Sequence, residues 1–164
     1  MTSRWLQNLT TTHFALRRCF PLSTLPAIDA AIAASERDHR AEIRCAIETA
    51  LPLRALFGGV GSAVRATEVF SALGVGNTTG NNGVLVYVLL AERSIEIVAD
   101  RGFTGLVAAA EWEAICREME AAFRAGHYEQ GTLAALERIG ALARRHFPAD
   151  GSDRNELPDR TVLL

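Results

Sequence analysis

The chain has few cysteines and none at the spacing of a metal or redox motif. Cys19, Cys45 and Cys116 form an odd, scattered set without a Cys-x-x-Cys pair. Such a set is typical of buried thiols in a reducing compartment and argues against a disulfide framework. No residue that would activate a thiol is apparent beside them, so we predict no catalytic cysteine.

Long apolar runs are also missing from the sequence. No run reaches the length of a transmembrane helix. The first ten residues, Met-Thr-Ser-Arg-Trp-Leu-Gln-Asn-Leu-Thr, lack the uninterrupted apolar core of a signal peptide. We therefore expect a cytoplasmic protein with no direct membrane span.

Neither sign of charge dominates. The formal net charge is −2 over 164 residues, so the chain has no excess of positive charge of the kind that binds nucleic acid. We expect no nucleic-acid partner. Hydrophobic residues make up 49% of the chain, enough for one globular domain with a real core.

Several catalytic signatures are absent. The four histidines, His13, His39, His127 and His146, show no His-x-x-x-His spacing, and no Gly-x-Ser-x-Gly elbow of a serine hydrolase is present. The glycine-rich residues 58–62 lack the Lys-Ser/Thr ending of a phosphate loop and the third glycine of a dinucleotide fingerprint. We predict no nucleotide cofactor.

What the sequence does contain is organised around an apolar segment, residues 84–90. It is too short for a membrane span and rich in β-branched residues, which predicts a strand buried on both faces. Residues 94–100 alternate between apolar and polar, as a half-buried strand does. Only Ala91-Glu92-Arg93 lies between them, which favours an antiparallel hairpin.

This hairpin brings the two ends of the stretch together. With a two-residue turn at 92–93, Val84 lies opposite Arg101. The loop of residues 81–83 and the loop of residues 100–102 are then neighbours, and they are the best candidate site in the sequence.

The remaining elements predict an α/β fold. Residues 42–48 alternate as a strand, and a helix from Ser62 to Leu73 connects them to residues 84–90, which implies a right-handed parallel crossover. Helical periodicity recurs after Thr24, around 109–125, and from about 129 to 147. The result is a mixed sheet of three to four strands with helices on its faces. We divide the chain into an N-terminal helical extension (1–22), the α/β domain (23–148) and a flexible polar tail (149–164) that hangs free.

Parallel pairing places several polar residues at one end of this sheet. They are Glu42, Asn81, Asn82 and Asp100, with Asp38 and His39 just upstream of the first strand. Converging oxygen ligands suit a hard cation such as Ca²⁺ or Mg²⁺. In the alternative interpretation, the asparagines only satisfy turn backbone and Asp100 pairs with Arg101 or Arg93. Spacing alone favours this alternative.

Four motifs in residues 25–148 point to a family. They are the hairpin from Asn82 to Gly102; Glu36-x-x-His39-x-x-Glu42-Ile43; Trp112-x-x-Ile-Cys-x-x-Met119 followed by Phe123-Arg-x-Gly-x-Tyr128-x-x-Gly131; and His146-Phe147-Pro148. Together they resemble the TPM domain, and the hairpin is the specific part. The resemblance implies a three-layer α/β/α sandwich with a sheet of about four strands, and this chain looks like the short, untethered bacterial branch.

Members of the TPM family include a thylakoid protein of photosystem repair that is reported as an acid phosphatase, and some members bind Ca²⁺ or another divalent ion through acidic loops. In this chain, residues 76–81 contain no carboxylate where family members often have an aspartate. Fewer charges should weaken the affinity for a cation.

The resemblance and the residues support two hypotheses. In the first, the chain is a weak divalent-metal-dependent phosphatase acting on phosphomonoesters: Glu42, Asn81, Asn82 and Asp100 hold the ion, His39 and Asp38 support it, and Arg93 or Arg101 steadies the phosphate. In the second, the same loops form a non-catalytic interaction module for a protein partner, for example a membrane-associated one, and a cation only orders them.

Overall fold

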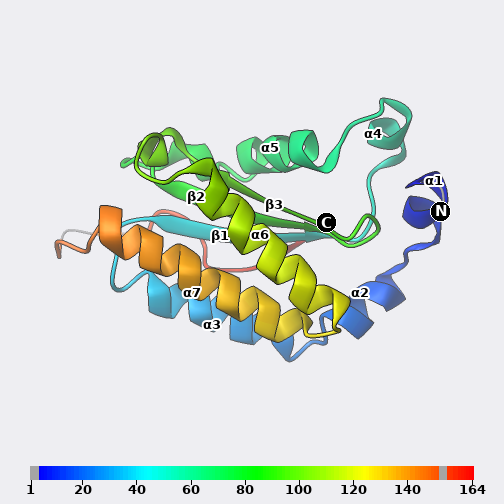
Figure 1. The fold of residues 1–164 in the computed structure, drawn as a ribbon, viewed down its shortest axis with the longest axis horizontal. Helices are drawn as coiled ribbons and strands as arrows, with labels where there is room; N and C mark the ends of the chain where they lie inside the picture. The colour runs from blue at the N-terminus through cyan, green and yellow to red at the C-terminus, as the bar shows by residue number, and fades with distance from the viewer. Residues whose placement is uncertain (1–3, 152–154) are drawn as a thin grey trace.

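The structure, a computed structural model, describes residues 4–151 and 155–164. Its centre is a four-stranded sheet with the strand order β3-β2-β1-β4 (Figure 1). The strands are β1 (Glu42–Glu48), β2 (Gly83–Leu89), β3 (Ser94–Ala99) and β4 (Val162–Leu163). β1 is parallel to β2 and to β4, whereas β2 and β3 are antiparallel, so the small mixed sheet expected from the sequence is confirmed.

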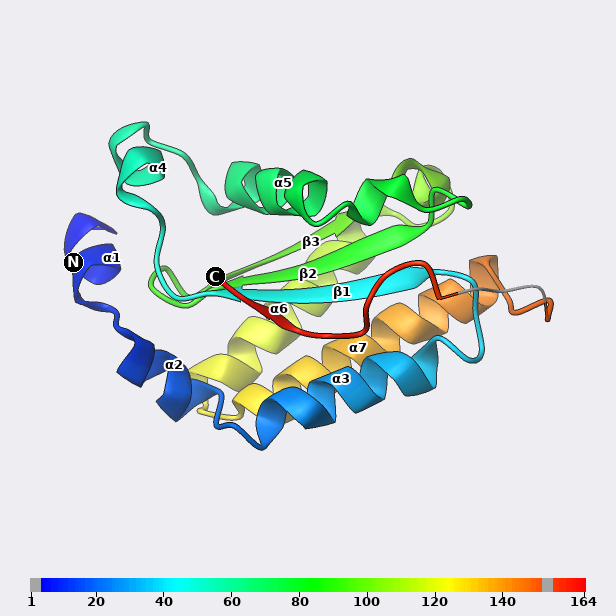
Figure 2. The ribbon, with the colours of Figure 1, turned by 180° about the vertical axis from the view of Figure 1, so that it is seen from behind.

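Helices cover both faces of the sheet (Figures 1 and 2). One face carries α5 (Ser62–Ala72), and the other carries α3 (Thr24–Ser35), α6 (Ala109–Arg124) and α7 (Tyr128–His146). Short elements complete the chain: α1 (Arg4–Thr10), α2 (His13–Cys19), α4 (Leu53–Phe57) and the 3-10 turns η1 (Val75–Asn77) and η2 (Arg101–Phe103). The three-layer α/β/α sandwich is thereby confirmed.

Strand β2 separates two hydrophobic cores. All seven of its residues are buried, because helices lie on both of its faces. Val84, Val86 and Val88 belong to the core beneath α3, α6 and α7, and Leu85, Tyr87 and Leu89 belong to the core beneath α5. The alternation follows from the two-residue period of a strand.

The hairpin register differs from the predicted one by two residues. Val84 pairs with Ala99, and the turn has four residues, 90–93, with Arg93 in the left-handed region at φ 52°. Beyond the ladder, the N–H groups of Leu90 and Ala91 donate to the carbonyls of Glu48 and Thr49, at and just after the end of β1. A shift of two residues leaves every side chain on its predicted face.

The prediction of a freely hanging tail is wrong for residues 155–164. Val162 and Leu163 pair with Ala46 and Ile47 as strand β4. Upstream, the N–H and hydroxyl groups of Thr161 both donate to Asp29, each over 2.7 Å. The edge of β1 offers unpaired backbone groups, and the tail satisfies them.

Strand β1 is more deeply buried than its alternating sequence predicts. All seven residues are buried, including Glu42, Arg44 and Glu48. The tail and α5 cover the face that the alternation assigns to solvent. Within the described residues, no helix is long and apolar enough to cross a membrane.

Candidate functional site

The two loops at the end of the hairpin are neighbours, which confirms the predicted juxtaposition. The N–H of Asp100 donates to the carbonyl of Gly83 over 2.8 Å, and the N–H of Gly102 donates to the carbonyl of Asn81 over 2.8 Å. We call residues 76–82 and 100–106 together the strand-end loops. Backbone hydrogen bonds hold them in one arrangement.

Two glycines allow this close approach. A Cβ atom on Gly83 would lie 2.0 Å from the carbonyl oxygen of Val75, and one on Gly102 would lie 2.4 Å from that of Asn81. Both neighbours are backbone atoms that cannot move aside cheaply. Any side chain at either position would therefore separate the segments that form the strand-end loops.

Polar side chains reinforce the same contact. Nε of Arg101 donates to Oδ1 of Asn81 over 2.8 Å, and Asn81 itself adopts the left-handed region at φ 49°. Oδ1 of Asp100 accepts from the N–H of Arg101 over 2.7 Å and so caps the 3-10 turn η2. Asp100 therefore caps a turn and Asn81 holds the side chain of Arg101, while the guanidinium of Arg101 remains exposed.

Two oxygens of the strand-end loops have no hydrogen-bond partner among the described residues. They are Oδ1 of Asn82 and Oδ2 of Asp100, and both are buried. Asn82 is otherwise engaged: its N–H donates to the hydroxyl of Thr78, and its amide nitrogen donates to the carbonyl of Arg40. Burying an acceptor without a donor is unfavourable, so these are the two atoms that a ligand could satisfy.

Glu42 does not join Asp100. Its side chain is buried under the tail, where its two carboxylate oxygens accept from the N–H groups of Glu156 and Leu157 over 3.0 Å and 2.9 Å. In the sheet, Glu42 is aligned with Gly83, and Asp100 lies on the other side of Gly83. Two strand spacings separate the backbones of the two acids, roughly 10 Å. Glu42 is thus an anchor for the tail.

His39 and Asp38 hold a different junction. Nε2 of His39 lies 2.9 Å from the hydroxyl of Ser35, and its backbone forms a β-bridge with Pro148. His39 is fully buried, and burial lowers the pKa of its imidazole. The carbonyl of Asp38 accepts from the N–H of Ala149. Among the described residues, this pair contacts α3, Arg144 of α7 and the segment after α7, and no bond of the pair reaches the strand-end loops.

The two arginines proposed for phosphate lie at opposite ends of β3. Arg101 is in the strand-end loops, whereas Arg93 is in the hairpin turn and lines a pocket of about 450 Å³ together with Tyr128 and Arg124. The two residues are eight positions apart along a mostly extended segment, which spans roughly 25 Å. Of the two, only Arg101 can act with Asp100.

The predicted ligand set does not fit a metal centre. Among the described residues, no group of three or more His, Cys, Asp or Glu side chains could hold an ion. Ca²⁺ takes six to eight oxygen ligands, and its affinity depends on the number of charged ones. Here Asp100 is the single carboxylate of the set that remains, because Glu42 is committed to the tail.

An acidic pocket near the tail was not predicted. It has a volume of about 330 Å³ and is lined by Glu36, Arg37, Glu42, Asn155 and Asp159, among others. Oε1 of Glu36 accepts from the N–H of Ile43 over 2.7 Å. Burial, reinforced by the charges of Glu42 and Asp159, raises the pKa of Glu36 to about 9. The spacing of Glu36 and Glu42 was visible in the sequence, but the docking of Asp159 beside them was not.

A buried ionic network was also missed. Glu48, on β1, accepts three hydrogen bonds from Arg65 of α5, two over 2.9 Å and one over 3.3 Å, and a fourth from the hydroxyl of Tyr87 over 2.5 Å. Its members come from three elements, and the alternation of β1 marks Glu48 as a solvent-facing residue. This network joins α5 to the sheet and contacts none of the strand-end loops.

Comparison with known sequences and structures identifies relatives. The family described as the TPM domain, labelled TPM_phosphatase, matches residues 20–142. The BA42 protein of the psychrophilic bacterium Bizionia argentinensis, solved by NMR, is similar with a TM-score of 0.76 and 27% identity, over 87% of this chain and 93% of that one. No curated protein matches the chain.

Two further solved structures share the fold alone. The N-terminal domain of the cg2496 protein from Corynebacterium glutamicum has a TM-score of 0.54 and 20% identity, over 74% of this chain and 72% of that one. The N-terminal domain of a protein from P. gingivalis has a TM-score of 0.59 and 19% identity, over 77% of this chain and 79% of that one.

Proposed function

The chain belongs to the TPM-domain family, and from that premise we propose that it is a non-catalytic recognition module whose strand-end loops bind a protein partner. The observation that carries the proposal is the contact between the loops, in which Gly102 and Arg101 both hydrogen bond to Asn81. A surface held in one conformation loses little entropy on binding, which favours recognition. A cation would only order these loops further.

The chemistry of the loop surface supports the same function. Its exposed residues are small and polar, with one cation, Arg101, and one large apolar residue, Leu106. Among the described residues of these loops there is no cysteine, histidine or lysine that could act as nucleophile or base. A partner segment that offers a carboxylate to Arg101 and an apolar side chain to Leu106 fits this surface. The expected interface is small, about 1,200 Å² or less, and its binding is transient.

Site-directed photo-cross-linking tests this proposal in cells. A photoreactive amino acid at Thr104, inside the strand-end loops, should give one reproducible adduct with a partner protein. The same amino acid at Arg117, exposed on α6, serves as the matched control and should not give that adduct. Arg101→Glu should weaken the Thr104 adduct about tenfold or more. The substitution would place a carboxylate of this chain against the carboxylate expected on the partner, and the two would repel each other.

Two outcomes would contradict the recognition function. One is the absence of any adduct at Thr104 in a chain that is folded and expressed normally. The other is an identical set of adducts from Thr104 and Arg117, since that pattern reports collisions rather than a site. Arg101 is exposed, so its substitution should leave the unfolding transition intact.

The second candidate is a weak phosphatase acting on phosphomonoesters. Two observations favour it: the label of the family, and the exposed guanidinium of Arg101, which could pair with a phosphate in the same loops that hold the unpartnered oxygen of Asp100. Because the ligand set does not fit a metal centre, we derive no metal-dependent step for it.

Hydrolysis of a generic phosphomonoester decides between the two functions. With Ca²⁺, Mg²⁺ or Mn²⁺ added, we expect the purified chain to release phosphate no faster than its Asp100→Asn variant. Metal-dependent hydrolysis that EDTA and Asp100→Asn both abolish would contradict the recognition function and support the phosphatase. Asp100→Asn keeps an oxygen that can cap η2, so the variant should fold.

A further inference from the structure

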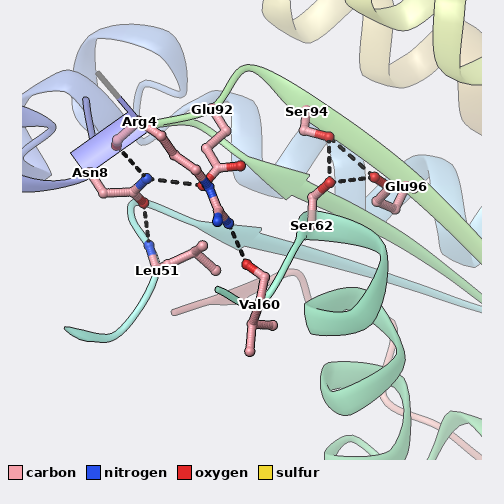
Figure 3. Close-up of polar contacts among 8 residues, drawn as sticks. All are labelled: Arg4, Asn8, Leu51, Val60, Ser62, Glu92, Ser94 and Glu96. Carbon is pink, nitrogen blue, oxygen red and sulfur yellow. Dashed lines mark hydrogen bonds and ion pairs between the residues drawn. The ribbon is translucent and has the colours of Figure 1, made fainter. Parts of the chain in front are cut away.

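Helix α1 is attached to the domain by its polar residues (Figure 3). Nε of Arg4 and the amide nitrogen of Asn8 both donate to Oε1 of Glu92 in the hairpin turn, over 2.6 Å and 3.0 Å. Oδ1 of Asn8 accepts from the N–H of Leu51 over 2.8 Å, and Arg4 also donates to the carbonyl of Val60. Asn8 is only 6% exposed.

The apolar residues of the same helix face solvent. Trp5, Leu6 and Leu9 are 40%, 50% and 61% exposed. A helix on the surface of a globular domain normally buries its apolar stripe and exposes its polar face. Helix α1 does the reverse, and much of its apolar face is exposed.

This apolar face continues onto neighbouring elements. The ring of Trp5 stacks edge-on against Phe57 of α4 at a centroid distance of 4.9 Å, and Phe57 is 75% exposed. Helices α1, α2 and α4 lie at the hairpin-turn end of the molecule, away from the strand-end loops (Figures 1 and 2). We define the apolar end as Trp5, Leu6, Leu9, Phe14, Leu53 and Phe57, all of them large exposed hydrophobic residues.

The charge of the apolar end differs from that of the rest of the chain. Residues 1–28 and 49–67, which contain the whole apolar end, carry five arginines and not one aspartate or glutamate. All 19 acidic residues lie in other stretches of the sequence, in a chain whose net charge is −2. One of them, Glu92 of the hairpin turn, reaches α1 and pairs there with Arg4. Three of the five arginines are exposed beside the apolar residues: Arg17 and Arg18 on α2, and Arg54 on α4.

This composition indicates what covers the apolar end. Exposed Trp, Phe and Leu residues flanked by cations are typical of surfaces that lie in the interface of a negatively charged membrane. A second copy of the chain is the poorer occupant, because two-fold pairing of this end would place arginines against arginines. Arginine also forms bidentate hydrogen bonds with phosphate, and the chain contains arginine but no lysine.

We propose that the apolar end docks this protein on the surface of an anionic lipid bilayer. The aromatic and leucine side chains enter the interface, and Arg17, Arg18 and Arg54 lie at the level of the lipid phosphates. The chain lies on the membrane and does not span it. The strand-end loops then face away from the lipid, so this inference stands independently of the recognition function.

Flotation with vesicles tests the electrostatic part of the docking. The full chain should float with vesicles of phosphatidylcholine and phosphatidylglycerol in equal parts and should not float with phosphatidylcholine alone. Each arginine at the surface should contribute roughly fivefold, so Arg17→Gln/Arg18→Gln/Arg54→Gln should lower the partition coefficient on the order of a hundredfold. The matched control, Arg37→Gln/Arg117→Gln/Arg145→Gln, removes three exposed arginines from other elements and should bind like the unmodified chain.

The apolar part is tested with a second pair of variants. Trp5→Ser/Phe57→Ser should abolish flotation, whereas Leu106→Ser, which removes an exposed leucine from the strand-end loops, should not. In a Trp112→Phe background, the emission of Trp5 should shift to the blue when anionic vesicles are added. Should the Trp5 variant disturb α1, the arginine variant still decides the question, because none of its three residues anchors α1.

Three results would overturn the proposal. The first is no flotation with anionic vesicles at low salt. The second is equal loss of binding in the apolar-end variants and their controls. The third is a concentration-dependent dimer, seen by sedimentation without lipid, that Trp5→Ser/Phe57→Ser dissociates, since it would assign the apolar end to a second copy.

Discussion

Replacing Glu48 by alanine should lower the free energy of unfolding by about 3–5 kcal/mol, the usual result of removing one partner of a buried ion pair. Glu48 is 2% exposed, and its carboxylate receives the paired hydrogen bonds of Arg65 and the hydroxyl of Tyr87. Without it, the guanidinium of Arg65 loses the buried one of its two carboxylate partners and keeps only the exposed Glu68. The phenol of Tyr87, which is fully buried, loses its partner at the same time.

The pKa shifts in this network agree with that expectation. The hydrogen bond to Glu48 is the main cause that raises the pKa of Arg65 above its ordinary value. Burial, and then the hydrogen bond to Glu48, raises the pKa of Tyr87. Both shifts keep the donors protonated at every physiological pH, so the network should persist across that range.

Urea unfolding measures the effect of Glu48→Ala. The matched control is Glu113→Ala, which removes an exposed carboxylate paired with Arg117 on α6 and should change stability by less than about 1 kcal/mol. Tyr87→Phe, which removes only the hydroxyl, should cost an intermediate amount of about 1.5–3 kcal/mol. Equal effects of Glu48→Ala and Glu113→Ala would mean that the network does not join α5 to the sheet.

Glu36 should make the protein less stable as the pH rises from acid to neutral. Its pKa is about 9 in the folded chain, against an ordinary value of 4.5. The folded state therefore holds a proton that the unfolded state releases. The stabilisation by this group is fully present below pH 4.5 and is lost as the pH rises through about 9. Over that range the unfolding free energy falls by up to about 1.4 kcal/mol per pH unit.

The variant Glu36→Gln removes this dependence. Glutamine keeps an oxygen that can accept from the N–H of Ile43, but it has no proton to lose. At pH 7 the variant should be more stable than the parent by up to about 3 kcal/mol, and at pH 4.5 the two should be equal.

Unfolding measured at several pH values, with Glu113→Gln as the control at an exposed position, isolates the contribution of Glu36. The difference between Glu36→Gln and the parent should grow steadily with pH, while the difference for Glu113→Gln stays small. Stability curves of Glu36→Gln and the parent that run parallel between pH 5 and pH 8 would contradict a buried, protonated Glu36.

The sequence was sufficient for the elements whose pattern is local. The unbroken apolar run of β2 and the alternation of β3 predict strands because side chains in a strand repeat every two residues. The helical periodicity after Thr24 and around residues 109–125 was equally informative. The adjacency of the strand-end loops followed from the hairpin, and even the error of two residues in register preserved it.

Contacts between distant segments could not be read in the same way. Strand β4 has two residues, too few for a pattern, and it forms only because β1 offers an open edge. When the tail docks, its backbone N–H groups donate to the carboxylate of Glu42, and Asp159 comes to lie near Glu36. The alternation of β1 marks Glu42 as solvent-facing, so its burial depends on a segment more than a hundred residues away.

The candidate site shows the same division. Asn81, Asp100 and Arg101 meet as their positions in the hairpin predict. Arg93 was assigned to the same site, but the strand that links it to Arg101 holds them at opposite ends of the sheet. Whether several acidic side chains meet at one site depends on where each side chain lies, and the spacing of residues in the sequence does not determine that.

Calorimetric titration with Ca²⁺ and with Mg²⁺ tests most directly whether the strand-end loops are a recognition surface held by protein contacts. With Asp100 as the single carboxylate that remains of the predicted ligand set, we expect no binding tighter than about 10⁻⁴ M for either ion and the same weak heats from Asp100→Asn. A dissociation constant in the micromolar range or below that Asp100→Asn abolishes would contradict this view and establish a metal centre at the end of the hairpin.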